Sequence, residues 1–259
     1  MEKMFKNAIL RKPAPNFASG LTTVSQGKPD FAKVIKQYQA YCDALERCGV
    51  TIKVLEADPG HPDSTFVEDT AVLTKKTAIL ARPGAESRQG EVRGIRAPLA
   101  KFFHYFAEIN APGTVDGGDI CEADNHFLIG LSQRTNEEGA KQLAEILDCD
   151  GYTSSLVDIR KTTSILHLKS GVAYLGENQL VVIEEMAGRK EFAGYDLLVV
   201  KTDESYAANC IRVNDHVLIP AGYPALLSLL ERRGHSVMPL EMSEFQKMDG
   251  GLSCLSLRF

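Results

Sequence analysis

HFLIGLSQRTNEEGAKQLAEIL, residues 126–147, shows most clearly the structural unit from which we predict the fold. It opens with an apolar run typical of a buried strand and continues through a polar loop. It ends with apolar residues at the i, i+3, i+4 spacing of an amphipathic helix, namely Ala140, Leu143, Ala144 and Leu147. The stretch therefore predicts a strand, a loop and a helix that packs back on the strand.

The same unit recurs along the chain. TAILARPGAESRQGEVRGIRAPLAKFF follows it from Thr77 and HVLIPAGYPALLSLLERRG from His216, while QLVVIEEMAGRKEFAGYDLLVV, from Gln179, is a shorter relative with a weaker helix signal. A fifth opens the chain, where NAILRKPAP precedes the helical PDFAKVIKQYQAYCDALERCG and the strand VTIKVLEA. Tandem α/β units of this kind predict closure around a pseudo-fivefold axis, with a site where the loops converge at one end.

Composition limits the class of protein. The 259 residues are 44% hydrophobic and 24% charged, as in an ordinary soluble globule, and the net charge of −5 argues against a nucleic-acid partner. MEKMFKNAILRKP has no apolar region before a small-residue cleavage site, and no apolar run is long enough for a membrane span, so we expect a cytoplasmic protein without a membrane partner. Six scattered cysteines without C-x-x-C spacing predict reduced thiols, with neither a zinc site nor a disulfide framework.

The C-terminal MDGGLSCLSLRF, residues 248–259, places Cys254 on an apolar, strand-like run. Termini fray unless a sheet holds them, so we expect this run to be a final strand inside the fold. A free cysteine in such a run is also explained as a small buried apolar residue.

Three further stretches concentrate chemically active side chains. PDSTFVEDT holds the carboxylates Asp63, Glu68 and Asp69, which are either solvated or, in so apolar a run, buried beside a positive partner. VDGGDI places Asp116 before two glycines, which suit either a turn or a close approach of backbone to a ligand. LHLKS places His167 in a strand-like alternation, where a structural histidine is the alternative to a catalytic one.

Two arginines occupy equivalent places in their units. Arg88 and Arg134 both follow a strand and precede a helix, so they are either surface residues or a clamp for one carboxylate. Together, a thiol, a histidine, several acids and two arginines suit nucleophilic chemistry on a substrate with a guanidinium at one end and an α-carboxylate at the other.

These motifs resemble one family. FVEDTAVLTKKTAILARPGAESRQGEV, DGGDI with HFLIGLSQRTNEEGA, LHLKSGVAYL, SYAANCIRVN and DGGLSCLSLRF are similar to the dimethylarginine dimethylaminohydrolases, especially the short bacterial ones, and the likeness runs nearly end to end. The resemblance implies a single five-bladed α/β propeller of the pentein superfamily across residues 1–259, without metal or organic cofactor. SGLTTVSQGKPDF resembles that family's lid, with Gly20 and Gly27 as candidate hinges.

The resemblance also implies residue roles. Cys254 is the expected nucleophile, His167 the general acid/base and Asp116 the acid that orients the histidine, although some relatives carry the longer Glu at this position. The expected substrate-binding residues are Leu21, Asp63, Glu68, Asp69, Arg88, Arg134, Met248 and Asp249.

The expected reaction is hydrolysis of Nω-methylated arginine to citrulline through a covalent thiouronium on the cysteine. The alternatives are an arginine deiminase, a citrulline hydrolase, or a non-catalytic pentein that binds a partner. The expected partner is a small-molecule substrate, and the sequence leaves open whether the chain forms a homodimer.

Overall fold

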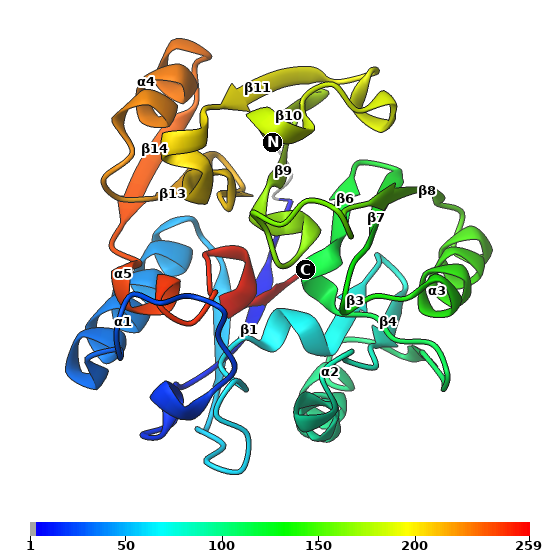
Figure 1. Ribbon diagram of the computed structural model, residues 1–259. Coiled ribbons are helices and arrows are strands. Elements are labelled where there is room, and N and C mark those ends of the chain that lie inside the picture. Colours follow the sequence, from blue (N-terminus) through cyan, green and yellow to red (C-terminus); the bar gives the residue numbers. More distant parts are fainter. Residues whose placement is uncertain (1–3) are drawn as a thin grey trace.

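Five three-stranded sheets surround a central axis in the computed structural model, which describes residues 4–259 (Figure 1). Their strand orders are β15-β1-β2, β3-β4-β5, β6-β7-β8, β11-β10-β9 and β12-β13-β14. The strands are β1 (Asn7–Arg11), β2 (Thr51–Leu55), β3 (Ala71–Leu73), β4 (Thr77–Leu80), β5 (Tyr105–Glu108), β6 (Ile120–Ala123), β7 (His126–Leu131), β8 (Thr153–Asp158), β9 (Val172–Gly176), β10 (Gln179–Ile183), β11 (Asp196–Val200), β12 (Ile211–Val213), β13 (His216–Pro220), β14 (Ser236–Leu240) and β15 (Leu257–Arg258).

Every sheet has the same pairing. The middle strand is antiparallel to one neighbour and parallel to the other, as β7 is to β6 and β8. The antiparallel strands lie nearest the axis, where β9 contacts β6 and β12, and β15 contacts β3. The parallel pairs are the strand–helix–strand units, because a parallel connection needs a crossover segment between its strands. The five predicted units are therefore confirmed.

The first sheet joins the two ends of the chain. Its inner strand is β15, which pairs antiparallel with β1 through Ala8 with Arg258 and Ile9 with Leu257. The Phe259 carbonyl oxygen accepts the Asn7 backbone N–H at 2.7 Å, and the Phe259 ring packs edge-on against Phe102. The C-terminal segment is thus fixed inside the sheet, as predicted.

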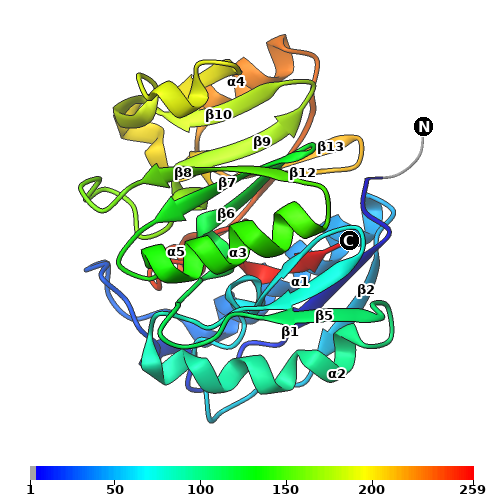
Figure 2. The same cartoon turned by 90° about the vertical axis from the view of Figure 1, so that its right-hand side faces the viewer.

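Helices cover the outer sides of the sheets (Figures 1 and 2). The longest is α1 (Phe31–Arg47), whose first turn is capped by the Asp30 side chain, and α3 (Glu137–Cys149) is capped in the same way by Asn136. The remaining helices are α2 (Arg96–Leu99), α4 (Pro224–Arg232) and α5 (Ser243–Gln246). No helix within residues 4–259 is long and apolar enough to cross a membrane.

Two units differ from the expected pattern in their helices. In the second, a 3-10 segment, Glu86–Gly94, occupies most of the crossover and α2 has only four residues. In the fourth, two 3-10 turns, Glu184–Met186 and Lys190–Phe192, replace an α-helix. Glycines interrupt both crossovers, and glycine disfavours a long α-helix because of its conformational entropy.

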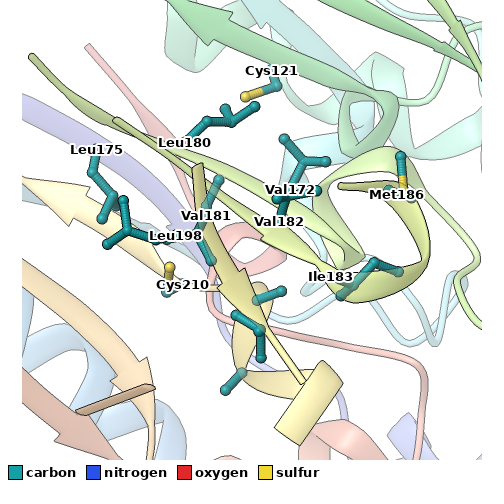
Figure 3. Packing of buried hydrophobic residues seen from close by; sticks show 14 of the residues in the cluster. Cys121, Val172, Leu175, Leu180, Val181, Val182, Ile183, Met186, Leu198 and Cys210 are labelled. Carbon is teal, nitrogen blue, oxygen red and sulfur yellow. The ribbon is translucent and has the colours of Figure 1, made fainter. Parts of the chain in front are cut away.

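The core lies between each sheet and its crossover segment. Figure 3 shows one such cluster, in which Leu180, Val181 and Val182 of β10 meet Val172 of β9 and Leu198 of β11. Each fully buried aliphatic side chain contributes about 1.5–3 kcal/mol of burial free energy. The middle strand β10 is buried on both faces, which is why it reads as a continuous apolar run, whereas the outer strand β11 exposes Asp196 and Val199.

Candidate active site

The predicted catalytic stretches occupy one repeated position, immediately before the inner strand of a sheet. The inner strands run antiparallel to the middle strands, so all five begin at the same end of the axis. Each is preceded by a short 3-10 segment, and these are Val67–Thr70, Gly117–Asp119, Leu168–Ser170, Thr202–Ala208 and Ser253–Leu255. The pseudo-fivefold repeat therefore brings together residues that are far apart in the sequence.

One cavity of about 160 Å³ lies where these segments meet. It collects ten of the eleven residues that the sequence nominated, all except Glu68. The ten are Leu21, Asp63, Asp69, Arg88, Asp116, Arg134, His167, Met248, Asp249 and Cys254.

Cys254 lies in a 3-10 turn, not on a strand as the apolar run suggested. The turn Ser253–Leu255 ends just before β15, so the strand holds the turn rather than the cysteine itself. The Ser253 backbone N–H donates to Asn209 Oδ1 at 3.0 Å, which ties the turn to the neighbouring sheet. Cys254 is half-buried and faces the cavity, unlike the fully buried Cys42, Cys121 and Cys210.

The surroundings of Cys254 disfavour its thiolate. Burial raises the pKa of the Cys254 thiol, and the negative charges of Glu68 and Asp69 raise this pKa further. Hydrogen bonds from the Gly251 backbone and the Ser253 side chain oppose the rise without outweighing it. A positive charge brought into the cavity would therefore have a large effect on the thiol.

His167 is held by Asp116. Its Nε2 lies 2.9 Å from Asp116 Oδ2, and both side chains are buried. Burial alone would lower the pKa of His167, but the charge of Asp69 and the hydrogen bond to Asp116 outweigh it and raise the pKa to about 9. His167 precedes the 3-10 turn Leu168–Ser170 instead of lying within a strand, which corrects the expected alternation.

The two glycines of DGGDI let the backbone pass close to neighbouring groups, which is the second of the two alternatives that the sequence offered. A methyl group at Gly118 would come 2.9 Å from Cγ of the His167 ring, and one at Gly117 would come 2.0 Å from the Glu68 carbonyl oxygen. The Gly118 backbone N–H donates to Asp69 Oδ1 at 2.8 Å. Only glycine fits between the histidine and the acid-bearing segment.

Asp119, the second acid of this motif, is fully buried. It accepts hydrogen bonds from the Ser132 hydroxyl at 2.6 Å, the Thr135 hydroxyl at 2.7 Å and the Leu168 backbone N–H at 3.0 Å. Burial raises its pKa to about 6 despite these donors and the nearby charge of His167. Asp119 thereby fixes the backbone of the segment that carries the histidine.

The two arginines differ in their surroundings. Arg88 is buried and already neutralised: its guanidinium contacts Asp69 Oδ2 at 2.5 Å and binds both carboxylate oxygens of Glu91. Arg134 is half-buried, and no carboxylate of residues 4–259 lies within salt-bridge distance of it. Arg134 is the cation with capacity left for a substrate carboxylate.

The segment of residues 21–30 has neither helix nor strand and lies against the cavity. The Leu21 backbone N–H donates to both oxygens of Asp63 at 3.1 Å. The backbone N–H and hydroxyl of Thr23 donate to Asp249 at 2.5 and 2.9 Å. Two cavity acids thus hold this segment down, and Gly27, with φ of +83°, supplies a bend that suits a hinge.

Glu68 is the nominated residue whose carboxylate the structure does not bring into the cavity. Its Oε1 lies 2.6 Å from Lys169 Nζ, and its Oε2 accepts the Ser253 hydroxyl at 2.9 Å. These groups line a second, larger cavity along the axis. Glu68 therefore lies behind the turn that carries Cys254.

Sequence reasoning missed three supporting residues: Asn209, Glu91 and Lys169. Asn209 directly follows the fourth of the five 3-10 segments, so the repeat position alone signals it. Glu91 lies three residues after Arg88, and this spacing is compatible with their ion pair. Nothing in the sequence pairs Lys169 with Glu68, which lies 101 residues away.

Asp69, Asp116 and His167 bring one potential ligand atom each to within 4.8 Å of one another, a spacing that a metal ion could bridge. Each group already has a partner, however: Arg88 for Asp69, and Asp116 and His167 for each other. The arrangement is therefore satisfied as an ion-pair network.

Comparison with known proteins agrees with this geometry. The protein-family model described as N,N dimethylarginine dimethylhydrolase, eukaryotic, matches residues 25–194. The N(G),N(G)-dimethylarginine dimethylaminohydrolase of Pseudomonas aeruginosa is 46% identical over 99% of this chain and 100% of its own length. This chain belongs to the dimethylarginine dimethylaminohydrolase family.

A second dimethylarginine dimethylaminohydrolase, from Streptomyces coelicolor, is 33% identical over 98% of this chain and 96% of its own length. A solved structure of the Pseudomonas aeruginosa enzyme, a cysteine-to-serine variant complexed with citrulline, matches with a TM-score of 0.96 and covers 99% of this chain and all of its own. The N-terminal domain of ArgZ, a cyanobacterial arginine dihydrolase, is 17% identical, covers 97% of both chains and has a TM-score of 0.86, a likeness in fold. The predicted five-bladed α/β propeller is thus confirmed for this dimethylarginine dimethylaminohydrolase family member.

Proposed function

We propose that this chain hydrolyses Nω-methylated arginines to citrulline and the corresponding methylamine, with Cys254 as nucleophile and His167 as general acid/base. One observation carries the proposal: a half-buried thiol and an Asp116-held histidine share a small cavity with Asp63, Asp69 and the unpaired Arg134. The cavity thus offers negative charge for a guanidinium and positive charge for an α-carboxylate.

Substrate binding itself prepares the nucleophile. The thiol pKa is raised in the free enzyme, so a bound guanidinium supplies the positive charge that makes ionisation of Cys254 favourable, and the thiol proton passes to solvent as the substrate binds. The segment of residues 21–30, held by Asp63 and Asp249, excludes water and strengthens this effect. His167, whose pKa is about 9, is protonated at neutral pH and ready to act as an acid.

The reaction then proceeds in two steps. The Cys254 sulfur bonds to the guanidinium carbon, the bond from that carbon to the methylated nitrogen breaks, and His167 gives its proton to the departing amine. A thiouronium remains on the sulfur. Water next adds to the same carbon and gives a proton to His167, and the carbon–sulfur bond breaks to leave citrulline and the thiol.

Solved relatives support this reading. The Pseudomonas aeruginosa enzyme has been crystallised with citrulline, and a histidine-to-glycine variant of a dimethylarginine dimethylaminohydrolase with 46% identity to this chain forms an adduct with S-methyl-L-thiocitrulline. The cytoplasmic location stays a prediction from the sequence, and the sequence leaves open whether the chain forms a homodimer.

Product analysis tests the proposal. Dimethylarginine, monomethylarginine, arginine and citrulline are offered in parallel, and citrulline, ornithine, ammonia and the methylamines are quantified. We expect citrulline with an equal amount of dimethylamine or methylamine, and no product from the Cys254→Ser control. Turnover of arginine or citrulline in preference to the methylated substrates would overturn the assignment in favour of a related guanidino or ureido hydrolase.

A further inference from the structure

The 3-10 turn Ser253–Leu255, here called the nucleophile turn, has consecutive residues that face two different cavities. Cys254 lines the candidate active site, whereas Ser253 lines an axial cavity of about 770 Å³. All five inner strands, β3, β6, β9, β12 and β15, contribute residues to this axial cavity. Thr74, Lys75 and Lys76 of the turn that follows β3 also line it, so the cavity extends to the end of the axis opposite the 3-10 segments. The Glu68 and Lys169 side chains line it close to Ser253.

Glu68 connects three of the five 3-10 segments. It lies on Val67–Thr70, receives the Ser253 hydroxyl of the nucleophile turn at 2.9 Å, and receives Lys169 of the Leu168–Ser170 turn at 2.6 Å. Lys169 is two residues after His167, so one carboxylate joins the turn of the nucleophile to the turn of the acid/base. The Glu68 side chain is 5% exposed and that of Lys169 18%, so solvent screens the pair only weakly.

We propose that Glu68 and its counter-ion Lys169 are positioning residues that hold the nucleophile and histidine turns together and set, by their balance of charge, how readily Cys254 ionises. This role rests on the proposed function, in which Cys254 is the nucleophile. In this role the Glu68 carboxylate does not contact the substrate, in contrast to the substrate-binding role that the family resemblance implies.

The charge and position of each group near Cys254 determine whether it raises or lowers the pKa of the thiol. Glu68 is the largest electrostatic influence that raises the pKa of the Cys254 thiol, after burial. Lys169, and Arg258 with Nη2 at 3.7 Å from Glu68, offset that negative charge. The other charged or titratable groups around Cys254 are Asp63, Asp69, Arg88, Asp116, Arg134, His167, Tyr206 and Asp249, and all of them stay unchanged in the variants below.

The test measures thiol reactivity without substrate. Cys254 is alkylated with iodoacetamide at several pH values, and the modified Cys254 peptide is quantified by mass spectrometry because Cys149 is also exposed. Below the thiol pKa the rate follows the thiolate fraction, partly offset by the lower nucleophilicity of a more acidic thiol. We expect Glu68→Gln to raise the rate about three- to tenfold and Lys169→Met to lower it by a similar factor.

The result that distinguishes the proposed role is a change of the alkylation rate in opposite directions in the two single variants. The double variant Glu68→Gln/Lys169→Met should return near the wild-type rate, and Lys169→Arg should retain it. Lys12 and Glu56 form an exposed ion pair at 3.0 Å, and Lys12→Met and Glu56→Gln serve as matched controls that leave the rate unchanged. Thermal unfolding of each variant checks the fold.

A purely structural pair would give changes of the same sign in both single variants, and that result, or no change in either, overturns the proposal. The alkylation rate does not depend on turnover. The proposed reaction can therefore fail product analysis while the alkylation pattern stands, and the reverse outcome is equally distinguishable.

Discussion

Asp116 Oδ2 lies 2.9 Å from Nε2 of His167, and the other Asp116 oxygen accepts the Gly84 backbone N–H at 2.8 Å. The aspartate side chain is therefore long enough to hold the histidine. Both carboxylate oxygens are engaged, so the acid and the Nε2 atom are fixed, and Nδ1 is the ring nitrogen left for proton transfer.

Asp116→Asn should move the histidine toward its neutral form. The hydrogen bond and charge of Asp116 raise the pKa of His167, so their loss lowers that pKa from about 9. We expect kcat to fall about 100-fold and the alkaline limb of kcat/KM to shift to lower pH. A pH–rate profile between pH 6 and 10 measures this, with Asp116→Glu as the control that keeps the charge. An alkaline limb that stays in place would exclude Asp116 from this role.

Arg134→Met should affect substrate binding and little else. The guanidinium has no carboxylate partner within the described chain, so its removal leaves no buried charge unpaired. We expect KM for methylarginine to rise about 10- to 100-fold with an unchanged Tm. An analogue without the α-carboxylate should bind weakly to wild type and variant alike. Equal losses for both ligands would disprove the predicted carboxylate contact.

Arg88→Met should instead damage the fold. Its removal leaves Asp69 and Glu91 buried without their cation, which costs about 3–5 kcal/mol. Urea unfolding at pH 7.5 measures the loss, and Arg134→Met is the matched control. A variant as stable as the control would show that the buried ion pairs contribute little.

The charge of His167 should stabilise the fold in one pH range. Its pKa is about 9 in the folded protein and 6.5 in a model peptide, so the stabilisation is complete below pH 6.5 and is lost as pH rises through 9. We expect the stability gap between wild type and His167→Asn to shrink by about 1–3 kcal/mol between pH 6.5 and 10. Urea unfolding across this range provides the measurement, and a constant gap would contradict the raised pKa.

The repeat of apolar runs was enough to predict the propeller, because each unit is local in sequence and its middle strand is buried on both faces. The site could be predicted from the sequence because reactive residues recur before the inner strand in four of the five sheets. Asn209 illustrates the limit, since an asparagine in that position carries no distinctive chemistry and only the geometry reveals its bond to Ser253.

Contacts between distant residues were not predictable from the sequence. Glu68 belongs to the same acidic stretch as Asp69, yet adjacent residues in a 3-10 turn point in different directions, so one enters the active site and the other the axial cavity. In the same way Arg88 and Arg134 occupy equivalent repeat positions, but only Arg88 has acids within reach. Local pattern does not determine which side chains pair across sheets.

The most direct test of the account is to trap the covalent intermediate on Cys254. Wild type and the His167→Gly variant, which lacks both the acid of the first step and the base of the second, are mixed with dimethylarginine and, separately, with S-methyl-L-thiocitrulline, whose methanethiolate leaving group needs no acid. The samples are quenched in acid and digested for mass spectrometry. We predict that the Cys254 peptide alone gains the mass of the substrate less its leaving group, and that with S-methyl-L-thiocitrulline more of it accumulates in His167→Gly than in wild type. Citrulline formation by the wild-type enzyme with no such adduct in either protein, or with an adduct on another cysteine, would contradict the mechanism.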